Sequence, residues 1–132
     1  MFVKLFGRNP LNRIRILLVD RNTEFLNAAE HFLALEPELE VVGRLPCCRD
    51  ALQHIEQLQP DIVVAELILA GANNQEAMSH VKALPQPPLL VMLTSDDEPE
   101  YHIFAQSLGA DGCVNKAEFG EQFLPLIRKL CA

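Results

Sequence analysis

The sequence lacks long apolar runs. No stretch approaches the roughly 18 apolar residues that a membrane-spanning helix needs, and the N-terminus lacks the continuous apolar segment of a signal peptide. Internal repeats and low-complexity segments are also missing from the 132 residues. We therefore predict a cytoplasmic protein that makes no contact with a membrane.

The cysteines show no spacing that is typical of a metal or redox site. They are Cys47, Cys48, Cys113 and Cys131. None belongs to a CxxC pair or accompanies a pair of histidines, and zinc sites and thiol redox motifs depend on such spacing. We expect free thiols, and the sequence predicts neither a metal nor a cofactor.

Basic residues are scarce beyond the first 13 positions. The chain has 11 Lys and Arg residues against 18 Asp and Glu residues, and three of the basic ones are Lys4, Arg8 and Arg13. No acid lies in residues 1–13, so the remainder carries 8 basic and 18 acidic residues, a net charge of −10. Such an acidic body repels phosphate backbones. We predict that it does not bind nucleic acid, and that any DNA contact needs another domain.

The sequence does contain a regular alternation of strand and helix patterns. Short apolar runs, typical of buried strands, alternate with segments whose apolar residues recur at helical spacing. The expected strands are residues 14–19, 39–45, 62–65, 89–93 and 112–115. The expected helices are residues 22–35, 49–58, 75–84 and 98–108, and a last one with Phe123, Leu126, Ile127 and Leu130.

This alternation predicts an α/β fold. Five β–α units with short connections indicate a five-stranded parallel, doubly wound sheet with five helices, in three layers, α/β/α. The strands are apolar on both sides, as a sheet covered on both faces requires. Pro125 has no N–H to donate to residue 121, so we expect the last helix to begin late or to bend.

Polar residues stand where the apolar runs end. In a doubly wound sheet the carboxyl ends of the strands meet at one edge. The residues expected there are Asp20, Arg21, Glu66, Thr94, Ser95 and Lys116. Simple strand termination also predicts polar residues at these points, so spacing alone leaves solvated ends and a functional site equally supported.

Four segments carry a resemblance to a known family. They are ILLVD, PDIVVAEL, VMLTS and LGADGCVNK. In this order and spacing, over about residues 13–131, the chain resembles the receiver domain of bacterial response regulators, which has the CheY-like or flavodoxin-like fold. LGADG is similar to the branch in which a DNA-binding helix-turn-helix follows the receiver. The resemblance divides the chain into an N-terminal extension, residues 1–12, and a receiver-like domain, residues 13–132.

The resemblance implies a role in two-component signalling and the phosphorelay. Receivers accept a phosphoryl group from a histidine kinase onto an Asp, with Mg²⁺ held by that Asp and by an acidic pair after the first strand. Asp20 matches the first acid of the pair. Thr94 matches the hydroxyl residue and Lys116 the lysine that contact the phosphoryl oxygens.

Three positions depart from the family pattern. Arg21 stands where the second acid belongs, Glu66 where the phosphoacceptor belongs, and Cys113 where an aromatic switch residue is usual. The family pocket of three carboxylates and one lysine sums to −2, which a divalent cation relieves. Here Asp20 and Glu66 oppose Arg21 and Lys116, so the sum is zero. The longer Glu66 side chain also disturbs the geometry of in-line attack.

These features predict a pseudo-receiver that neutralises its own pocket, with no metal and no catalytic residue. Glu66 is expected to pair with Arg21 and Lys116. It could imitate a phosphorylated Asp or form only a structural ion pair. The second role is favoured, because a phosphoryl group brings nearly two charges where Glu brings one, and because Cys113 is small.

We therefore expect a phosphorylation-independent protein-interaction module, with a signalling kinase or an output domain as partner. It could be the input domain of a transcription regulator. The alternatives are a working receiver modified at Glu66 or Asp20, and a pseudo-receiver that binds a small molecule. We also expect a homodimer through the fourth helix, fifth strand and fifth helix, where Tyr101 and Phe104 lie near Cys113.

Overall fold

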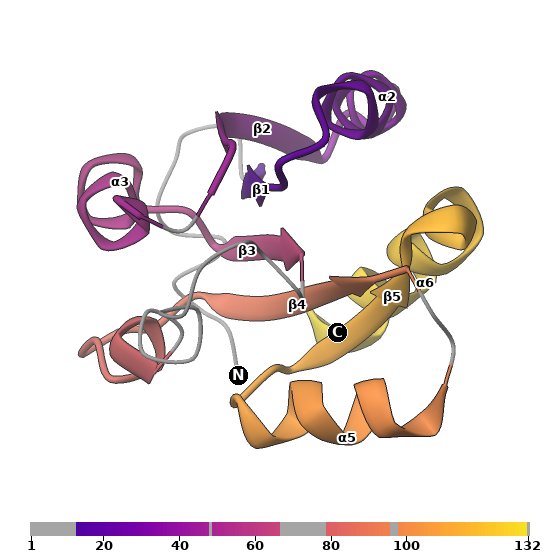
Figure 1. Ribbon diagram of the computed structural model, residues 1–132. Helices are drawn as coiled ribbons and strands as arrows, with labels where there is room; N and C mark the ends of the chain where they lie inside the picture. Colours follow the sequence, from indigo (N-terminus) through magenta and orange to yellow (C-terminus); the bar gives the residue numbers. More distant parts are fainter. Residues whose placement is uncertain (1–12, 48, 67–78, 96–97, 132) are drawn as a thin grey trace.

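The computed structural model describes residues 13–47, 49–66, 79–95 and 98–131 (Figure 1). The elements are β1 (Ile14–Val19), α2 (Thr23–Leu33), β2 (Leu39–Leu45), α3 (Ala51–Leu58), β3 (Ile62–Glu66), β4 (Leu89–Thr94), α5 (Pro99–Ser107), β5 (Gly112–Asn115), a 3₁₀ turn (Lys116–Glu118) and α6 (Phe119–Leu130). Residues 79–82 are also helical, within the helix predicted for residues 75–84, whose first four residues lie outside the described residues. The N-terminal extension lies outside them as well.

The strands form one parallel sheet in the order β2-β1-β3-β4-β5. Helices cover both faces, with α2 and α6 on one and α3 and α5 on the other (Figure 1). The predicted three-layer, doubly wound α/β fold is therefore confirmed. No helix among the described residues is both long and apolar enough to span a membrane.

Side-chain alternation along the strands divides the core into two clusters. Along β1, Ile16 and Leu18 pack with α2 and α6, whereas Leu17 and Val19 pack with α3 and α5. All four are buried, because successive side chains of a strand point to opposite faces. The two faces of the sheet therefore have separate surroundings, which matters for the site.

The last helix excludes one of the two predicted effects of Pro125. It begins at Phe119, six residues before Pro125, which lies inside it, so a late start is wrong, and a bend stays a prediction. Proline removes one helical hydrogen bond, and its ring crowds the carbonyl of the residue four positions before it. Phe119, Phe123 and Ile127 are buried on one face of α6, and this apolar burial outweighs the missing bond.

Two aspartates anchor the amino edge of the sheet. The Asp61 N–H donates to Arg15 O at 2.8 Å, and Asp61 Oδ2 accepts from Arg15 N at 2.9 Å. The same arrangement joins Asp111 to Leu90, with distances of 2.7 Å and 2.8 Å. Each aspartate thus extends the hydrogen-bond ladder to the neighbouring strand, just before β3 and β5 begin.

Candidate functional site at the carboxyl edge of the sheet

Asp20 follows the last residue of β1 and is fully buried, with 0% of its surface exposed. Its N–H continues the ladder to β2 by donating to Leu45 O at 3.0 Å. Asp20 Oδ1 accepts from Asn22 N at 2.8 Å, and Asn22 in turn caps α2 by accepting from Phe25 N at 3.0 Å. Asp20 is therefore held between the strand and the capped start of the helix.

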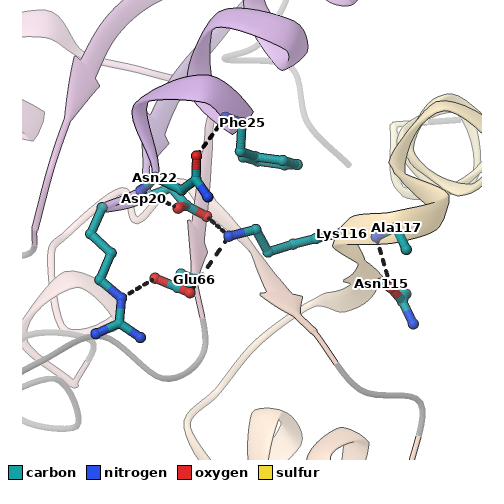
Figure 2. A network of polar contacts seen from close by, with 8 residues as sticks. Asp20, Asn22, Phe25, Glu66, Asn115, Lys116 and Ala117 are labelled. Atoms are coloured by element: carbon teal, nitrogen blue, oxygen red, sulfur yellow. Dashed lines mark hydrogen bonds and ion pairs between the residues drawn. The ribbon is translucent and has the colours of Figure 1, made fainter.

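Lys116 lies between the two carboxylates of the site (Figure 2). Its Nζ is 2.7 Å from Asp20 Oδ2 and 3.5 Å from Glu66 Oε2. Only 15% of the Lys116 side chain is exposed. The structure therefore brings together three residues that the sequence places at the ends of three different strands.

Arg21 contacts the second oxygen of Glu66. Arg21 Nε lies 3.4 Å from Glu66 Oε1, and the Arg21 side chain is 53% exposed while that of Glu66 is 10% exposed. The two expected ion pairs of Glu66, with Arg21 and Lys116, are thus present. The Arg21 contact is a single one through Nε, not a forked pair, and Lys116 is the more buried of the two cations.

Two buried carboxylate oxygens of the site have ion-pair partners but no aligned hydrogen-bond donor in the described part of the chain. Asp20 Oδ2 and Glu66 Oε1 are buried and accept no well-aligned hydrogen bond among the described residues. Each nevertheless lies within ion-pair distance of a cation, Lys116 and Arg21 respectively. Buried carboxylates without such a cation would be costly, so the four side chains depend on one another.

An aromatic ring supports the central lysine. Lys116 Nζ lies 4.7 Å from the centroid of the Phe25 ring, a distance at which a cation is attracted to the ring face. Figure 2 shows the Phe25 ring beside the Lys116 side chain. The sequence placed Phe25 on the buried face of a helix and indicated no role at the site, because the contact arises only when α2 packs near the end of β5.

The turn that carries Lys116 is held by its own polar contacts. Asn115 Oδ1 accepts from Ala117 N at 2.8 Å, and Asn115 N donates to Gln122 Oε1 at 3.1 Å. Gln122 Nε2 donates to Glu118 Oε1 at 3.1 Å. These bonds link β5 to the first turns that follow it and define the direction of the lysine.

The remaining predicted site residues, Thr94, Ser95 and Cys113, lie on or directly after β4 and β5. Thr94 ends β4, is buried, and pairs in register with Asn115. Ser95 follows it and is exposed. Cys113 is half-buried in β5 and packs against the cluster on the α3 and α5 face. Phe25 belongs to the cluster on the opposite face.

The residues present do not fit a magnesium ion. Mg²⁺ prefers six oxygen ligands in octahedral geometry. Of the four carboxylate oxygens, Asp20 Oδ1 accepts from Asn22 N and the others lie 2.7 to 3.5 Å from Lys116 or Arg21. Among the described residues, no three His, Cys, Asp or Glu side chains form a group that could hold a metal ion. Lys116 and Arg21 are the cations that lie beside these carboxylates among the described residues.

Fold and site together define a flavodoxin-like α/β protein with a charged cluster at the carboxyl edge of its sheet. The model of the response regulator receiver domain family matches residues 16–128. The chain therefore belongs to the response regulator receiver domain family.

Individual relatives agree with this assignment. The transcriptional regulatory protein DegU of Brevibacillus brevis is 29% identical over 106 residues, which is 80% of this chain and 44% of DegU. The sensory transduction protein LytT of Bacillus cereus is 29% identical over 85 residues, 64% of this chain and 35% of LytT. The chain spans between 31% and 56% of the length of the curated relatives compared with it.

Solved structures show the same fold. The receiver domain of the putative response regulator NarL from Mycobacterium tuberculosis superposes with a TM-score of 0.79 at 20% identity, covering 89% of this chain and 95% of that one. A chain in the crystal structure of the CheA3 P1 domain in complex with CheY6 from R. sphaeroides gives a TM-score of 0.78 at 22% identity, covering 89% and 95%.

Proposed function

We propose that this receiver domain acts without phosphorylation, as a protein-interaction module in two-component-type signalling. The observation that carries the proposal is the pairing of Glu66, the residue that the resemblance assigns to the phosphoacceptor position. Its two carboxylate oxygens lie 3.4 Å and 3.5 Å from Arg21 and Lys116. A carboxylate neutralised on both oxygens is a weak nucleophile, and the site offers no place for the metal that phosphoryl transfer relies on.

Glu66 in this proposal is a structural charge and not an imitation of a phosphorylated aspartate. A phosphoryl group would bring nearly two negative charges and three acceptor oxygens. Glu66 brings one charge, which Arg21 and Lys116 share. Cys113, at the position of the family's aromatic switch, packs on the opposite face of the sheet from Phe25. These features support constant pairing over switching, and we propose no catalytic role for the chain.

The partner we propose is another signalling protein, either a kinase or an output domain. One structurally similar chain comes from a complex of the CheA3 P1 domain with CheY6 from R. sphaeroides, and the relative DegU is a transcriptional regulatory protein. Residues 14–132 carry a net charge of −10, which disfavours direct binding of nucleic acid by this domain.

The α5, β5 and α6 surface is the proposed homodimer interface; α5 and α6 are the predicted fourth and fifth helices. On α5, Ile103 is 66% exposed and Phe104 lies at its side with more than a third of its surface exposed. Tyr101, expected to lie on this surface, packs partly against the core.

We expect sedimentation velocity to give a dimer at micromolar concentration, and Ile103→Glu to give a monomer. A wild-type protein that stays monomeric throughout this range contradicts the interface.

Intact mass spectrometry after incubation with a small acyl phosphate and Mg²⁺ tests the central proposal. We expect no mass increase, because Glu66 is paired and no metal is held. A receiver from a phosphorylatable regulator, treated in parallel, gives the increase of one phosphoryl group. Stoichiometric phosphorylation at Glu66 or Asp20 would support the alternative of a working receiver and overturn the proposal.

A further inference from the structure

Among the described residues, three side chains from different parts of the fold contact the ammonium of Lys116. Two are the carboxylates of Asp20 and Glu66, at 2.7 Å and 3.5 Å. The third is the face of the Phe25 ring, 4.7 Å from Nζ. Figure 2 shows the lysine reaching from the end of β5 toward Asp20 beside this ring. Any change in the charge of the carboxylates therefore acts on an ammonium that also rests on α2.

Phe25 continues into a group of aromatic rings between α2 and α6. Its centroid is 5.5 Å from that of Phe119, at an interplanar angle of 81°. Phe119 also meets Phe32 edge to face at 6.0 Å and stacks on Phe123 at 4.7 Å. Both edge-to-face and offset stacked pairs are favourable geometries. The ring group joins the two helices on one face of the sheet.

The face that carries α5 is separated from this group by the sheet. Cys113 packs with the cluster that contains Ala105 of α5, whereas Phe25 and Phe119 belong to the other cluster. The family's usual route from pocket to surface passes through an aromatic residue at the position of Cys113. A small thiol there offers no comparable side chain to move.

We propose that Phe25 is a positioning residue for Lys116. Through Phe25 and Phe119, the charge of the pocket is coupled to the packing of α2 on α6, and not to the face of the sheet that carries α5. The inference rests on the proposed function, because it treats the pocket as a permanent ionic cluster. It also names the surface whose packing responds to the charge of that cluster. A partner whose affinity depends on the pocket charge would bind over α2 and α6.

A double-mutant cycle tests the contact between Lys116 and Phe25. We expect Lys116→Met and Phe25→Leu to be coupled by about two- to thirtyfold in the unfolding equilibrium constant, the range of a partly desolvated cation–π contact. Phe32→Leu is the matched control, because Phe32 also lies on α2 and meets Phe119 but has no contact with Lys116. Its coupling to Lys116→Met should stay within about twofold.

Amide chemical shifts test the direction of the coupling. Glu66→Gln removes one pocket charge while keeping the side-chain shape. We expect the amides in the first turns of α2 and α6 to shift, and those of α5 to stay near their wild-type positions. In a Phe25→Leu background the response in α6 should largely disappear, whereas Phe25→Tyr, which retains the ring face, should preserve it.

Equal coupling of Lys116→Met to Phe25→Leu and Phe32→Leu would overturn the inference, as would a response to Glu66→Gln concentrated in α5. These outcomes are independent of the phosphodonor experiment. Phosphorylation of the wild type would refute the proposed function while leaving the ring contact measurable. An unphosphorylated protein without the predicted coupling would refute only the inference.

Discussion

Carboxylates lie at both the amino and the carboxyl edge of the sheet, with different partners. At the amino edge, Asp61 and Asp111 accept hydrogen bonds from backbone N–H groups of neighbouring strands at 2.9 Å and 2.8 Å. At the carboxyl edge, Asp20 and Glu66 share the ammonium of Lys116. Asp111 also has a lysine partner, Lys82, whose Nζ lies 3.0 Å from Asp111 Oδ2, in addition to its backbone donor.

The difference separates an anchor from a site. A backbone N–H is fixed by the sheet and cannot leave without breaking the ladder. A side-chain cation can be replaced by a metal, a ligand or another residue without disturbing the strands. Substitutions at the amino edge should therefore lower the free energy of unfolding modestly and leave Mg²⁺ binding and phosphodonor reactivity unchanged. Substitutions at the carboxyl edge should change stability and these two properties.

The largest effect is expected from rebuilding the acidic pocket. Arg21→Asp together with Glu66→Asp restores the family's pair of acids and its acceptor, giving three carboxylates beside Lys116. We expect this double variant to bind Mg²⁺ and to gain the mass of one phosphoryl group from an acyl phosphate, which the wild type does not. Intact mass spectrometry and calorimetric Mg²⁺ titration measure the two gains.

The matching control keeps the longer acceptor. Arg21→Asp alone leaves Glu66 in place, so a metal site can form while the attacking oxygen stays displaced by a methylene. This single variant should bind Mg²⁺ without becoming phosphorylated. If the double variant binds Mg²⁺ but also resists phosphorylation, side-chain identity at positions 21 and 66 does not explain the lack of phosphodonor reactivity that we propose for the wild type.

Removing a lysine from each edge should give unequal losses of stability. Lys116→Met leaves Asp20 and Glu66 buried, with Arg21 as the one cation beside them among the described residues, and breaking a buried pair costs on the order of 3 kcal/mol. Lys82 lies 3.0 Å from Asp111 in a more exposed pair, so Lys82→Met should cost about 1 kcal/mol or less. Urea unfolding of both variants measures the difference. Equal losses of unfolding free energy would show that the lysines of the two edges do not differ in their contribution to stability.

The fold was predictable because its strands are apolar on both faces and its helices on one. Residues 14–19, 39–45 and 112–115 were predicted as strands with the bounds they have in the structure. The sheet extends β3 to Glu66 and β4 to Thr94, one residue further than their apolar runs. Ladder pairing, such as that of Glu66 with Leu93, carries a strand past its last apolar residue.

The members of the site and the pairing of Glu66 with Arg21 and Lys116 were predictable, but the contact of Lys116 with Phe25 and the exposure of Arg21 were not. Strand ends identify Asp20, Glu66 and Lys116, because all strands of a parallel sheet finish at one edge. The central place of Lys116 depends on its contact with Phe25, which joins segments about 90 residues apart. The half-exposed position of Arg21 depends on its side-chain conformation. Periodicity carries no information on either.

Removing Arg21 should have a smaller effect than removing Lys116. Arg21 makes one contact with Glu66 and is half exposed, so solvent screens the charge that it neutralises. We expect Arg21→Ala to lower the free energy of unfolding by about 1 kcal/mol, with partial recovery in millimolar Mg²⁺ because Glu66 Oε1 then faces no cation. A neutral variant on which Mg²⁺ has no more effect than on the wild type would show that Arg21 only extends into solvent.

The smallest expected effect is that of Mg²⁺ on the wild type, which should be none. A ligand that binds the folded state selectively raises the free energy of unfolding, and with it the thermal midpoint, by mass action. At a ligand concentration of a hundred times the dissociation constant, the stabilisation is about 2.7 kcal/mol. In this pocket Asp20 and Glu66 already oppose Lys116 and Arg21, so a divalent cation would have to displace two positive side chains to reach its oxygen ligands. We therefore expect scanning calorimetry in millimolar MgCl₂ to give the midpoint measured in NaCl of equal ionic strength, and the Arg21→Asp, Glu66→Asp variant to show a rise under the same conditions. A rise in the wild type that NaCl does not reproduce would mean that the cations of the carboxyl edge yield to a metal, and that this edge is not neutralised by its own side chains.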